Sequence, residues 1–244
     1  MSKAKKGWLI TAAVLTVLGT LLFAGAGAAV GFDTTKLSLV KPETNTYEIT
    51  EDFDKISIDV STAGVNILPA EDGICKVVCK ESEKINHTAS VEDGTLKIAV
   101  SDTRAWYERL SFFFSELNVT VYLPEKEYES VSVDVSTGNI SISSLTARCS
   151  IDVKTSTGDI LLKDVIVTGT LRTRSSTGNI KLDACDAGEI SIKTSTGNVT
   201  GSLLSGKVFT ASTSTGNVSV PDTNSGGKCE IKTSTGNVKI IISD

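Results

Sequence analysis

The feature that most constrains the fold of this chain is a tetrapeptide that recurs six times in its C-terminal half. The motif reads Ser-Thr-Gly followed by Asn or Asp, and its copies are spaced 19 or 20 residues apart. Self-similarity at a fixed period is the sequence signature of repeat architectures, in which each unit stacks on its neighbours. The last two positions of the six copies, which we expect to form a structural ladder, are Gly138, Asn139, Gly158, Asp159, Gly178, Asn179, Gly197, Asn198, Gly216, Asn217, Gly236 and Asn237.

Apolar and polar residues alternate along the sequence on both sides of each motif glycine. Mostly apolar residues occupy the positions seven and five before the glycine and two after it, as Val131, Val133 and Ile140 do in the first copy. The position four before the glycine is polar in every copy, beginning with Asp134. Alternation with period two on both sides of a glycine predicts two half-buried strands joined by a bend, because glycine readily supplies a positive φ.

A unit of this length cannot bury its inner face alone. We therefore expect successive units to stack in register at the usual strand spacing of about 4.8 Å. The predicted fold is all-β: a single-stranded parallel β-solenoid, or β-helix, with about 20 residues per coil. Stacking also accounts for the uniform serine, threonine and asparagine columns, since identical polar side chains can hydrogen-bond along the stack. The regular solenoid is assigned to residues 131–244.

An irregular copy of the unit lies upstream of the regular repeats. Residues 56–67 match residues 131–142 column for column, so the solenoid is predicted to begin near residue 50. Between these copies, strand-like runs alternate with turn signals. We expect residues 51–130 to form irregular N-terminal coils and a cap.

The N-terminal segment differs in composition from the rest of the chain. Residues 8–30 are apolar except for three threonines, and as a helix they would extend roughly 35 Å against about 30 Å of bilayer hydrocarbon. Three lysines precede this run, and the positive-inside bias places such an N-terminus in the cytoplasm and the solenoid outside the cell. Residues 1–31 are thus predicted to be a lysine-rich tip and a transmembrane signal anchor, followed by a polar stalk at residues 32–50. A cleaved signal peptide is the alternative, because small residues resembling a cleavage site lie at positions 24–28.

The serial Ser-Thr-Gly-Asn/Asp-Ile/Val units carry a family resemblance. Together with the upstream segment Leu117-Asn118-Val119-Thr120-Val121-Tyr122-Leu123-Pro124, they resemble the bacterial putative-adhesin family with β-strand repeats, a domain of unknown function. The resemblance covers about residues 50 to 243. It implies a membrane-anchored protein similar to the accessory proteins of Lia-type envelope-stress operons, and it implies no catalytic residues.

Composition narrows the classes of partner and cofactor. A net charge of −5 provides no general basic field, which argues against nucleic acid as a partner. The single histidine, His87, lies in a polar run and is interpreted as a solvated loop residue without metal-ligand companions. The cysteines are odd in number and lack Cys-x-x-Cys spacing, so we expect reduced thiols and neither a disulfide framework nor a metal site. They are Cys75, Cys79, Cys149, Cys185 and Cys229. No cofactor is expected.

Two arrangements of charge on the predicted outer face bear on function. Asp134 and Asp152 would lie about 8 Å apart in neighbouring coils, within the range of inverting glycosidases. An ion pair with Lys154 is the simpler interpretation, and it is the one we favour. Lys154, Arg174 and Lys193 would form a short basic ladder, interpreted as a solubilising face.

One segment departs from the repeat pattern and concentrates large apolar side chains. We expect it to cap the N-terminal end of the solenoid, and an exposed contact for a membrane or a partner is the alternative. These candidate interaction residues are Trp106, Tyr107, Leu110, Phe112, Phe113 and Phe114.

These observations predict a non-catalytic, membrane-anchored cell-surface protein that presents its solenoid for adhesion or for contact with the cell envelope. The partners we expect are the membrane, through residues 8–30, and a cell-wall glycan or an envelope protein. An accessory component of an envelope-stress sensor and a carbohydrate-active solenoid enzyme are the alternatives.

Overall fold

The computed structural model of this chain describes residues 3–29, 43–81, 85–103 and 117–243. Contacts divide the chain into two units, residues 1–41 with 106–115 and residues 42–105 with 116–244. Each unit is described by itself.

The helix α1 (Lys3–Ala29) is the described element of the first unit. The hydroxyls of Thr11 and Thr16 donate hydrogen bonds to backbone carbonyls one turn earlier, so these polar groups are satisfied within the helix. Within the described ranges, no helix has both the length and the apolar character needed to cross a membrane. The structure therefore does not support the transmembrane helix predicted for residues 8–30.

The second unit is built from strands alone among its described residues. Three of its strands have 17 or 18 residues and bend through the corners of their coils rather than ending there. In chain order the strands are β1 (Glu43–Ile49), β2 (Lys55–Thr62), β3 (Gly64–Pro69), β4 (Cys75–Glu81), β5 (Ile85–Glu92), β6 (Thr95–Asp102), β7 (Asn118–Leu123), β8 (Glu127–Thr137), β9 (Ile140–Thr157), β10 (Ile160–Thr177), β11 (Ile180–Thr196), β12 (Val199–Leu203), β13 (Val208–Thr215), β14 (Val218–Ser219), β15 (Lys228–Thr235) and β16 (Val238–Ile242).

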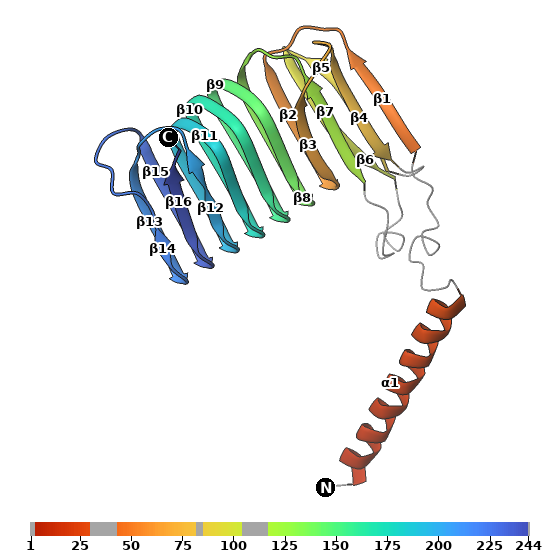
Figure 1. The fold of residues 1–244 in the computed structure, drawn as a ribbon. Helices are drawn as coiled ribbons and strands as arrows, with labels where there is room; N and C mark the ends of the chain where they lie inside the picture. The colour runs from red at the N-terminus through yellow and green to blue at the C-terminus, as the bar shows by residue number, and fades with distance from the viewer. Residues whose placement is uncertain (1–2, 30–42, 82–84, 104–116, 244) are drawn as a thin grey trace. The chain divides into compact units, whose positions relative to one another are not determined.

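Strands β8 to β11 form the regular part of the stack, which Figure 1 shows as nested, bent strands. β10 lies parallel to both β9 and β11, with Ile160 opposite Ile140 on one side and opposite Ile180 on the other. All three isoleucines are buried, as the parity of their columns predicts. The all-β class, the parallel stacking and the coil of about 20 residues are confirmed here.

Two kinds of corner bend each coil. At the first corner, the motif glycines Gly138, Gly158 and Gly178 have φ between 147° and 153°, in a region that side chains rarely adopt. A Cβ atom on Gly178 would also lie 1.9 Å from the backbone oxygen of Gly158, so the coils approach too closely for any other residue. At the second corner, Ser144 and Asp164 adopt the left-handed conformation with φ of 55° and 52°.

The C-terminal coils do not stack in chain order. β15 lies between β11 and β13, because Cys229 faces Ile190 on one side and Phe209 on the other. Likewise, β16 lies between β12 and β14. The expectation that each coil stacks on the preceding one is therefore wrong at this end. Every coil presents the same backbone groups and columns, so the last coil fits onto β11 as well as the preceding one would.

The N-terminal end of the stack mixes parallel and antiparallel strands. β2 lies parallel to β8 with Ile56 opposite Val131, which confirms the upstream copy of the repeat. β6 and β7 add a further parallel layer on β2 and β3. β4 and β5 then pair antiparallel with this layer, and β1 pairs antiparallel with β4. The sequence does not predict these antiparallel strands, and β1 lies within the predicted stalk at residues 32–50.

Candidate functional site

The outer surface of the coils carries a row of charged side chains. The polar position four residues before each motif glycine brings Asp134, Lys154, Arg174 and Lys193 opposite one another on β8 to β11, and Lys232 of β15 continues the row. Lys154 Nζ lies 2.7 Å from Asp134 Oδ2. This hydrogen bond raises the pKa of Lys154, while neighbouring Arg174 acts in the opposite direction. The predicted basic ladder therefore lies on adjacent strands.

Glu230 is the acidic group that neutralises the C-terminal end of this row. Its carboxylate lies 2.7 Å from Lys232 Nζ, 3.5 Å from Lys228 Nζ and 3.9 Å from Lys193 Nζ. The hydrogen bond from Lys232 and the nearby lysine charges hold the pKa of Glu230 below its usual range. These lysines therefore already have an acidic partner.

Two arginines in the middle of the face differ from these lysines. Arg172 and Arg174 are exposed on β10, two positions apart on the same side of the strand. Arg172 has Asp152 opposite it on β9 and Ser191 opposite it on β11. Among the described residues, neither arginine has a carboxylate within 4 Å. Their donors are therefore available to an external anion.

The carboxylates considered for glycoside hydrolysis occupy the positions that the repeat predicts. Asp134 and Asp152 lie on neighbouring strands, and Asp152 faces Ser132, two positions before Asp134. The ion pair between Asp134 and Lys154 leaves both side chains about half exposed, at 46% and 50%. A general acid in such an enzyme needs a surrounding that keeps it protonated near neutral pH. A solvated ion pair does not provide one.

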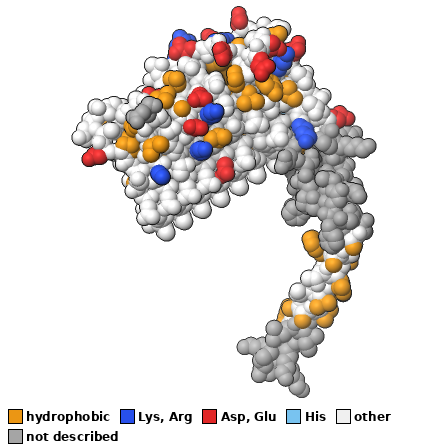
Figure 2. All heavy atoms as spheres, viewed as in Figure 1, with side chains coloured by type: hydrophobic (Ala, Val, Ile, Leu, Met, Phe, Trp, Pro, Cys, Tyr) orange, Lys and Arg blue, Asp and Glu red, His pale blue; other side chains and the backbone are white. Residues whose placement is uncertain are grey.

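Apart from the Asp159 carboxylate, the motif corners place uncharged side chains along one edge of the stack. Asn139 Oδ1 accepts a hydrogen bond of 2.8 Å from the backbone nitrogen of Asp159, and Asp159 Oδ1 accepts one of 2.7 Å from that of Asn179. The motif serine and threonine side chains are exposed. Figure 1 shows β8 to β11 ending at this edge, which is almost free of charged and apolar side chains in Figure 2. The Asn and Asp side chains of the motif therefore join one coil to the next through hydrogen bonds.

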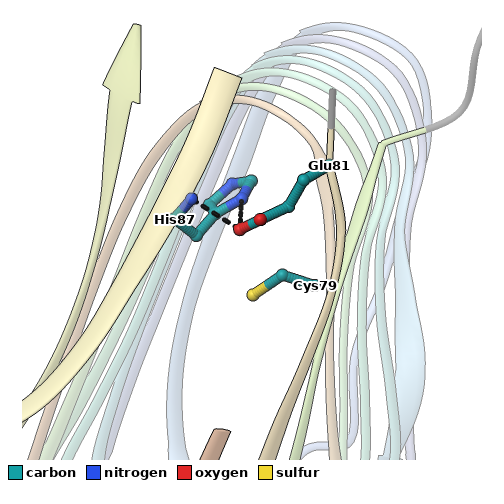
Figure 3. A group of neighbouring side chains, drawn as sticks. All are labelled: Cys79, Glu81 and His87. Atoms are coloured by element: carbon teal, nitrogen blue, oxygen red, sulfur yellow. Dashed lines mark hydrogen bonds and ion pairs between the residues drawn. The ribbon is translucent and has the colours of Figure 1, made fainter. Parts of the chain in front are cut away.

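A second candidate site lies in the interior at the N-terminal end of the stack. Cys79 and Glu81 are two positions apart on β4, so both point inward, and His87 comes from β5. One ligand atom from each residue lies within 4.8 Å of the other two, as Figure 3 shows. All three residues are buried, with exposures of 0%, 1% and 3%.

The structure corrects the interpretation of His87 as a solvated loop residue. Its backbone nitrogen donates a 2.5 Å hydrogen bond to Glu81 Oε1, and its ring Nδ1 lies 3.2 Å from the same oxygen. Burial lowers the pKa of His87, which outweighs the opposing effect of the Glu81 carboxylate. Burial therefore favours the neutral form of this imidazole. The polar run around it hid this role, because the alternation that buries Ile85 and His87 spans only two positions.

Polar neighbours on β1 orient this interior cluster. Asn45 Nδ2 donates a 2.5 Å hydrogen bond to Glu81 Oε2, and the Tyr47 hydroxyl donates one of 2.9 Å to the backbone carbonyl of His87. Burial, reinforced by the Glu81 charge, raises the pKa of the Cys79 thiol to about 12. A thiol, a carboxylate and an imidazole together are a donor set suited to a divalent transition metal.

The other cysteines have no such companions. Cys75, Cys185 and Cys229 are buried and Cys149 is exposed, and all are free thiols. The Cys185 thiol donates to the carbonyl of Leu162 at 3.4 Å. Among the described residues, the three buried thiols belong to no second group of metal-ligating side chains.

An open pocket of about 440 Å³ lies where the ends of β3 and β7 meet β9. Its one lysine, Lys126, donates a hydrogen bond to the carbonyl of Phe53 and lies 4.9 Å and 5.2 Å from the ring centroids of Phe53 and Tyr128. The Tyr128 hydroxyl donates to the carbonyl of Pro124. Both of these groups are therefore already bonded within the fold. The candidate interaction residues between Trp106 and Phe114 lie outside the described residues.

Similar solved structures come from bacteria. A structure described as a "putative cell adhesion protein" from Clostridium sporogenes ATCC 15579 has a TM-score of 0.52 and 16% sequence identity, covering 83% of this chain and 100% of that chain. A "putative adhesin" from Bacteroides fragilis NCTC 9343 has a TM-score of 0.48 and 20% identity, covering 82% of this chain and 97% of that chain. At 16% identity, the first likeness concerns the fold alone. No curated protein matches the chain.

The repeats also match a family model. The model described as Toastrack DUF4097 matches residues 53–244, from the turn before β2 to the end of the stack. This match confirms the family resemblance carried by the Ser-Thr-Gly-Asn units. The chain belongs to the Toastrack DUF4097 family.

Proposed function

We propose that this chain is a non-catalytic, adhesion-type protein that binds an extended anionic polymer of the bacterial cell envelope. The observation that carries the proposal is the row of basic side chains on successive strands, at whose centre Arg172 and Arg174 lack a carboxylate partner among the described residues. The description of one similar bacterial structure as a "putative cell adhesion protein" supports the same class of function.

The spacing of the row suits a linear ligand. Neighbouring strands lie about 4.8 Å apart, and side chains two positions apart on one strand are separated by about 6.8 Å. The face therefore carries basic side chains at short, regular intervals, from Lys154 through Arg174 to Lys193. The two lysines each have an acidic neighbour, so the arginines between them are the cations most accessible to a ligand. An arginine guanidinium binds carboxylate or phosphate with two parallel hydrogen bonds. A glycan with repeated acidic groups would engage several coils at once.

The proposal is tested by removing the two arginines. The variant carrying Arg172→Gln and Arg174→Gln is compared with wild type for co-sedimentation with purified cell walls. We expect binding to weaken about tenfold, which corresponds to about 1.4 kcal/mol. Wild-type binding should also fall as salt is added, because solvent-exposed charges are screened.

The matched control carries Lys163→Gln and Lys181→Gln. These lysines are also exposed, they belong to the segments of β10 and β11 that follow the motif corner, and their replacement removes the same charge. The control should bind as wild type does. Equal loss in both variants would mean that net charge, rather than the basic row, determines binding, and unchanged binding in the arginine variant would refute the proposal.

We also propose that the stack is displayed on the outer side of the cytoplasmic membrane, with the N-terminus inside. The lysines before residue 8 support this orientation. Protease added to intact cells should remove a C-terminal epitope tag and spare an N-terminal one. Protection of the C-terminal tag in cells whose tag is digested after lysis would contradict the orientation.

A further inference from the structure

We propose that Cys79, Glu81 and His87 form a zinc site inside the N-terminal end of the stack. The inference is independent of the proposed function, because these side chains are buried and the basic row lies on the outer surface.

The geometry of the three donors is close to that of a bound ion. Zinc lies about 2.3 Å from a cysteine sulfur and about 2.0 to 2.2 Å from histidine nitrogen or carboxylate oxygen, so ligand atoms around a tetrahedral ion are separated by about 3.3 to 3.7 Å. The donor atoms of Cys79, Glu81 and His87 lie within 4.8 Å of one another. Small side-chain rotations are sufficient to close the remaining distance.

The charges of the three side chains are consistent with a bound divalent ion. On binding zinc, Cys79 would release its proton to solvent, and its thiolate together with the Glu81 carboxylate would balance the two positive charges of the ion. Without the ion, the hydrogen-bond partners of the buried Glu81 side chain among the described residues are Asn45 and His87, and no lysine or arginine among them lies within 4 Å of it. Burying an uncompensated charge is costly. An ion at this place would remove the imbalance.

One of the three potential metal ligands takes no part in the hydrogen bonds of the cluster. Glu81 accepts from Asn45 and His87, but Cys79 makes no hydrogen bond among the described residues. Cys75 and Cys229 are likewise buried without a hydrogen bond among the described residues, whereas Cys185 donates its S–H to a backbone carbonyl. What distinguishes Cys79 is that its sulfur lies beside a carboxylate and an imidazole.

The site would connect two series of hydrogen-bonded strands that lie on opposite sides of the interior. β4 belongs to the series of strands that runs through β7 and β3, and β5 belongs to the series that runs through β6 and β2. Asn45 on Glu81 and Tyr47 on the carbonyl of His87 act as supporting contacts, as the neighbours of metal ligands commonly do. Three protein ligands leave one tetrahedral position, which a water molecule can fill.

Metal binding is measured on the full-length chain. The protein is unfolded in chelator, freed of metal, and refolded with or without equimolar ZnCl₂, so that burial of the site does not prevent entry. We expect one zinc per chain after dialysis, and a rise in Tm of about 5 to 10 °C at zinc concentrations 100-fold above Kd. Refolding with CoCl₂ should produce a near-ultraviolet thiolate-to-cobalt charge-transfer band.

The decisive comparison is Cys79→Ser against Cys229→Ser. Both cysteines are 0% exposed, so both substitutions place a hydroxyl in the core, but only Cys79 has ligands beside it. Cys79→Ser should lose the cobalt band and the zinc-dependent rise in Tm, and Cys229→Ser should keep both. A band that survives Cys79→Ser would overturn the assignment.

Wild-type protein keeps the inference falsifiable if Cys79→Ser does not fold. A wild-type chain that refolds without retaining zinc and without a cobalt band overturns the proposal by itself. His87→Gln provides a second variant, which should abolish stoichiometric zinc binding while leaving wall binding of the folded protein unchanged. If the arginine variant loses its binding to cell walls but keeps its zinc, the two proposals are independent of each other.

Discussion

Replacing Gly178 by alanine tests the close stacking of coils at the motif corner. Gly178 has a φ of 150°, and an added Cβ would lie 1.9 Å from the backbone oxygen of Gly158 and 2.5 Å from its carbonyl carbon. These are backbone atoms, so no flexible side chain can move aside. The coils must therefore separate locally.

The cost follows from three effects. A side chain in this backbone region costs about 1 to 3 kcal/mol, and the forced contact costs about 1 to 3 kcal/mol more. Separation also weakens the hydrogen bonds from Gly158 N to Thr177 O (2.9 Å) and from Ser175 Oγ to Gly158 O (3.2 Å), each contributing about 1 kcal/mol. We expect Gly178→Ala to lower the free energy of unfolding by about 4 kcal/mol.

Gly94→Ala is the matched control. Gly94 has a φ of 69°, also positive, but a Cβ there would meet nothing within 4 Å. This variant isolates the backbone cost, which is about 1 to 2 kcal/mol. Urea unfolding of the three proteins measures the difference. If Gly178→Ala costs no more than Gly94→Ala, the close approach of the coils does not determine why glycine occupies the motif.

Three further predictions concern the coils around it. Ile180→Asp should destabilise by several kcal/mol while the exposed Lys181→Asp changes little, and similar urea midpoints would contradict the inward assignment of Ile180. Thr173→Val should stabilise by about 1 kcal/mol, because Thr173 Oγ1 is buried without a hydrogen-bond partner; a lower Tm would contradict this. Burial alone would raise the pKa of Asp186, but hydrogen bonds from Lys207 and Ser205 outweigh it and hold that pKa below its usual value. Since the folded pKa is depressed, the stabilisation is present above about pH 4 and is lost as pH falls through the folded pKa, so the deficit of Asp186→Asn against wild type should shrink at acid pH.

The regular part of the fold follows directly from the sequence. Period-two alternation around Gly158 fixes which side chains point inward, and a 20-residue spacing fixes which residues become neighbours. Both outcomes depend on local geometry that every copy repeats. The pairing of Ile160 with Ile140 and Ile180 is therefore what the columns predict.

The order of the last coils depends on something that the columns do not encode. Cys229 and Phe209 occupy the same column, so the sequence offers nearly equal partners for Ile190. The column itself does not distinguish between them. Phe209 is partly buried, as expected for a terminal coil. Periodicity alone carries no information about this choice.

The interior cluster was only partly accessible to sequence reasoning. Cys79 and Glu81 share a parity in an extended run, which places both on one face of a strand. A carboxylate on an otherwise apolar inward face is itself a signal of a specific contact. The partner, His87, lies on a different strand, β5, and its inward direction depends on how β5 pairs with β6. That direction is a tertiary property, which no local pattern reveals.

The transposed final coil has a consequence for how the chain acquires its structure during synthesis. Domains generally fold from the N-terminus as they are made, and a solenoid stacked in chain order could add one coil at a time behind the ribosome. Here β15 and β16 lie inside the stack although they follow β13 and β14 in the chain. β13 pairs with β15 and with no other described strand, so it cannot take its final place until β15 has been synthesised. The last two coils of the stack therefore become ordered together, after β15 and β16 have left the ribosome.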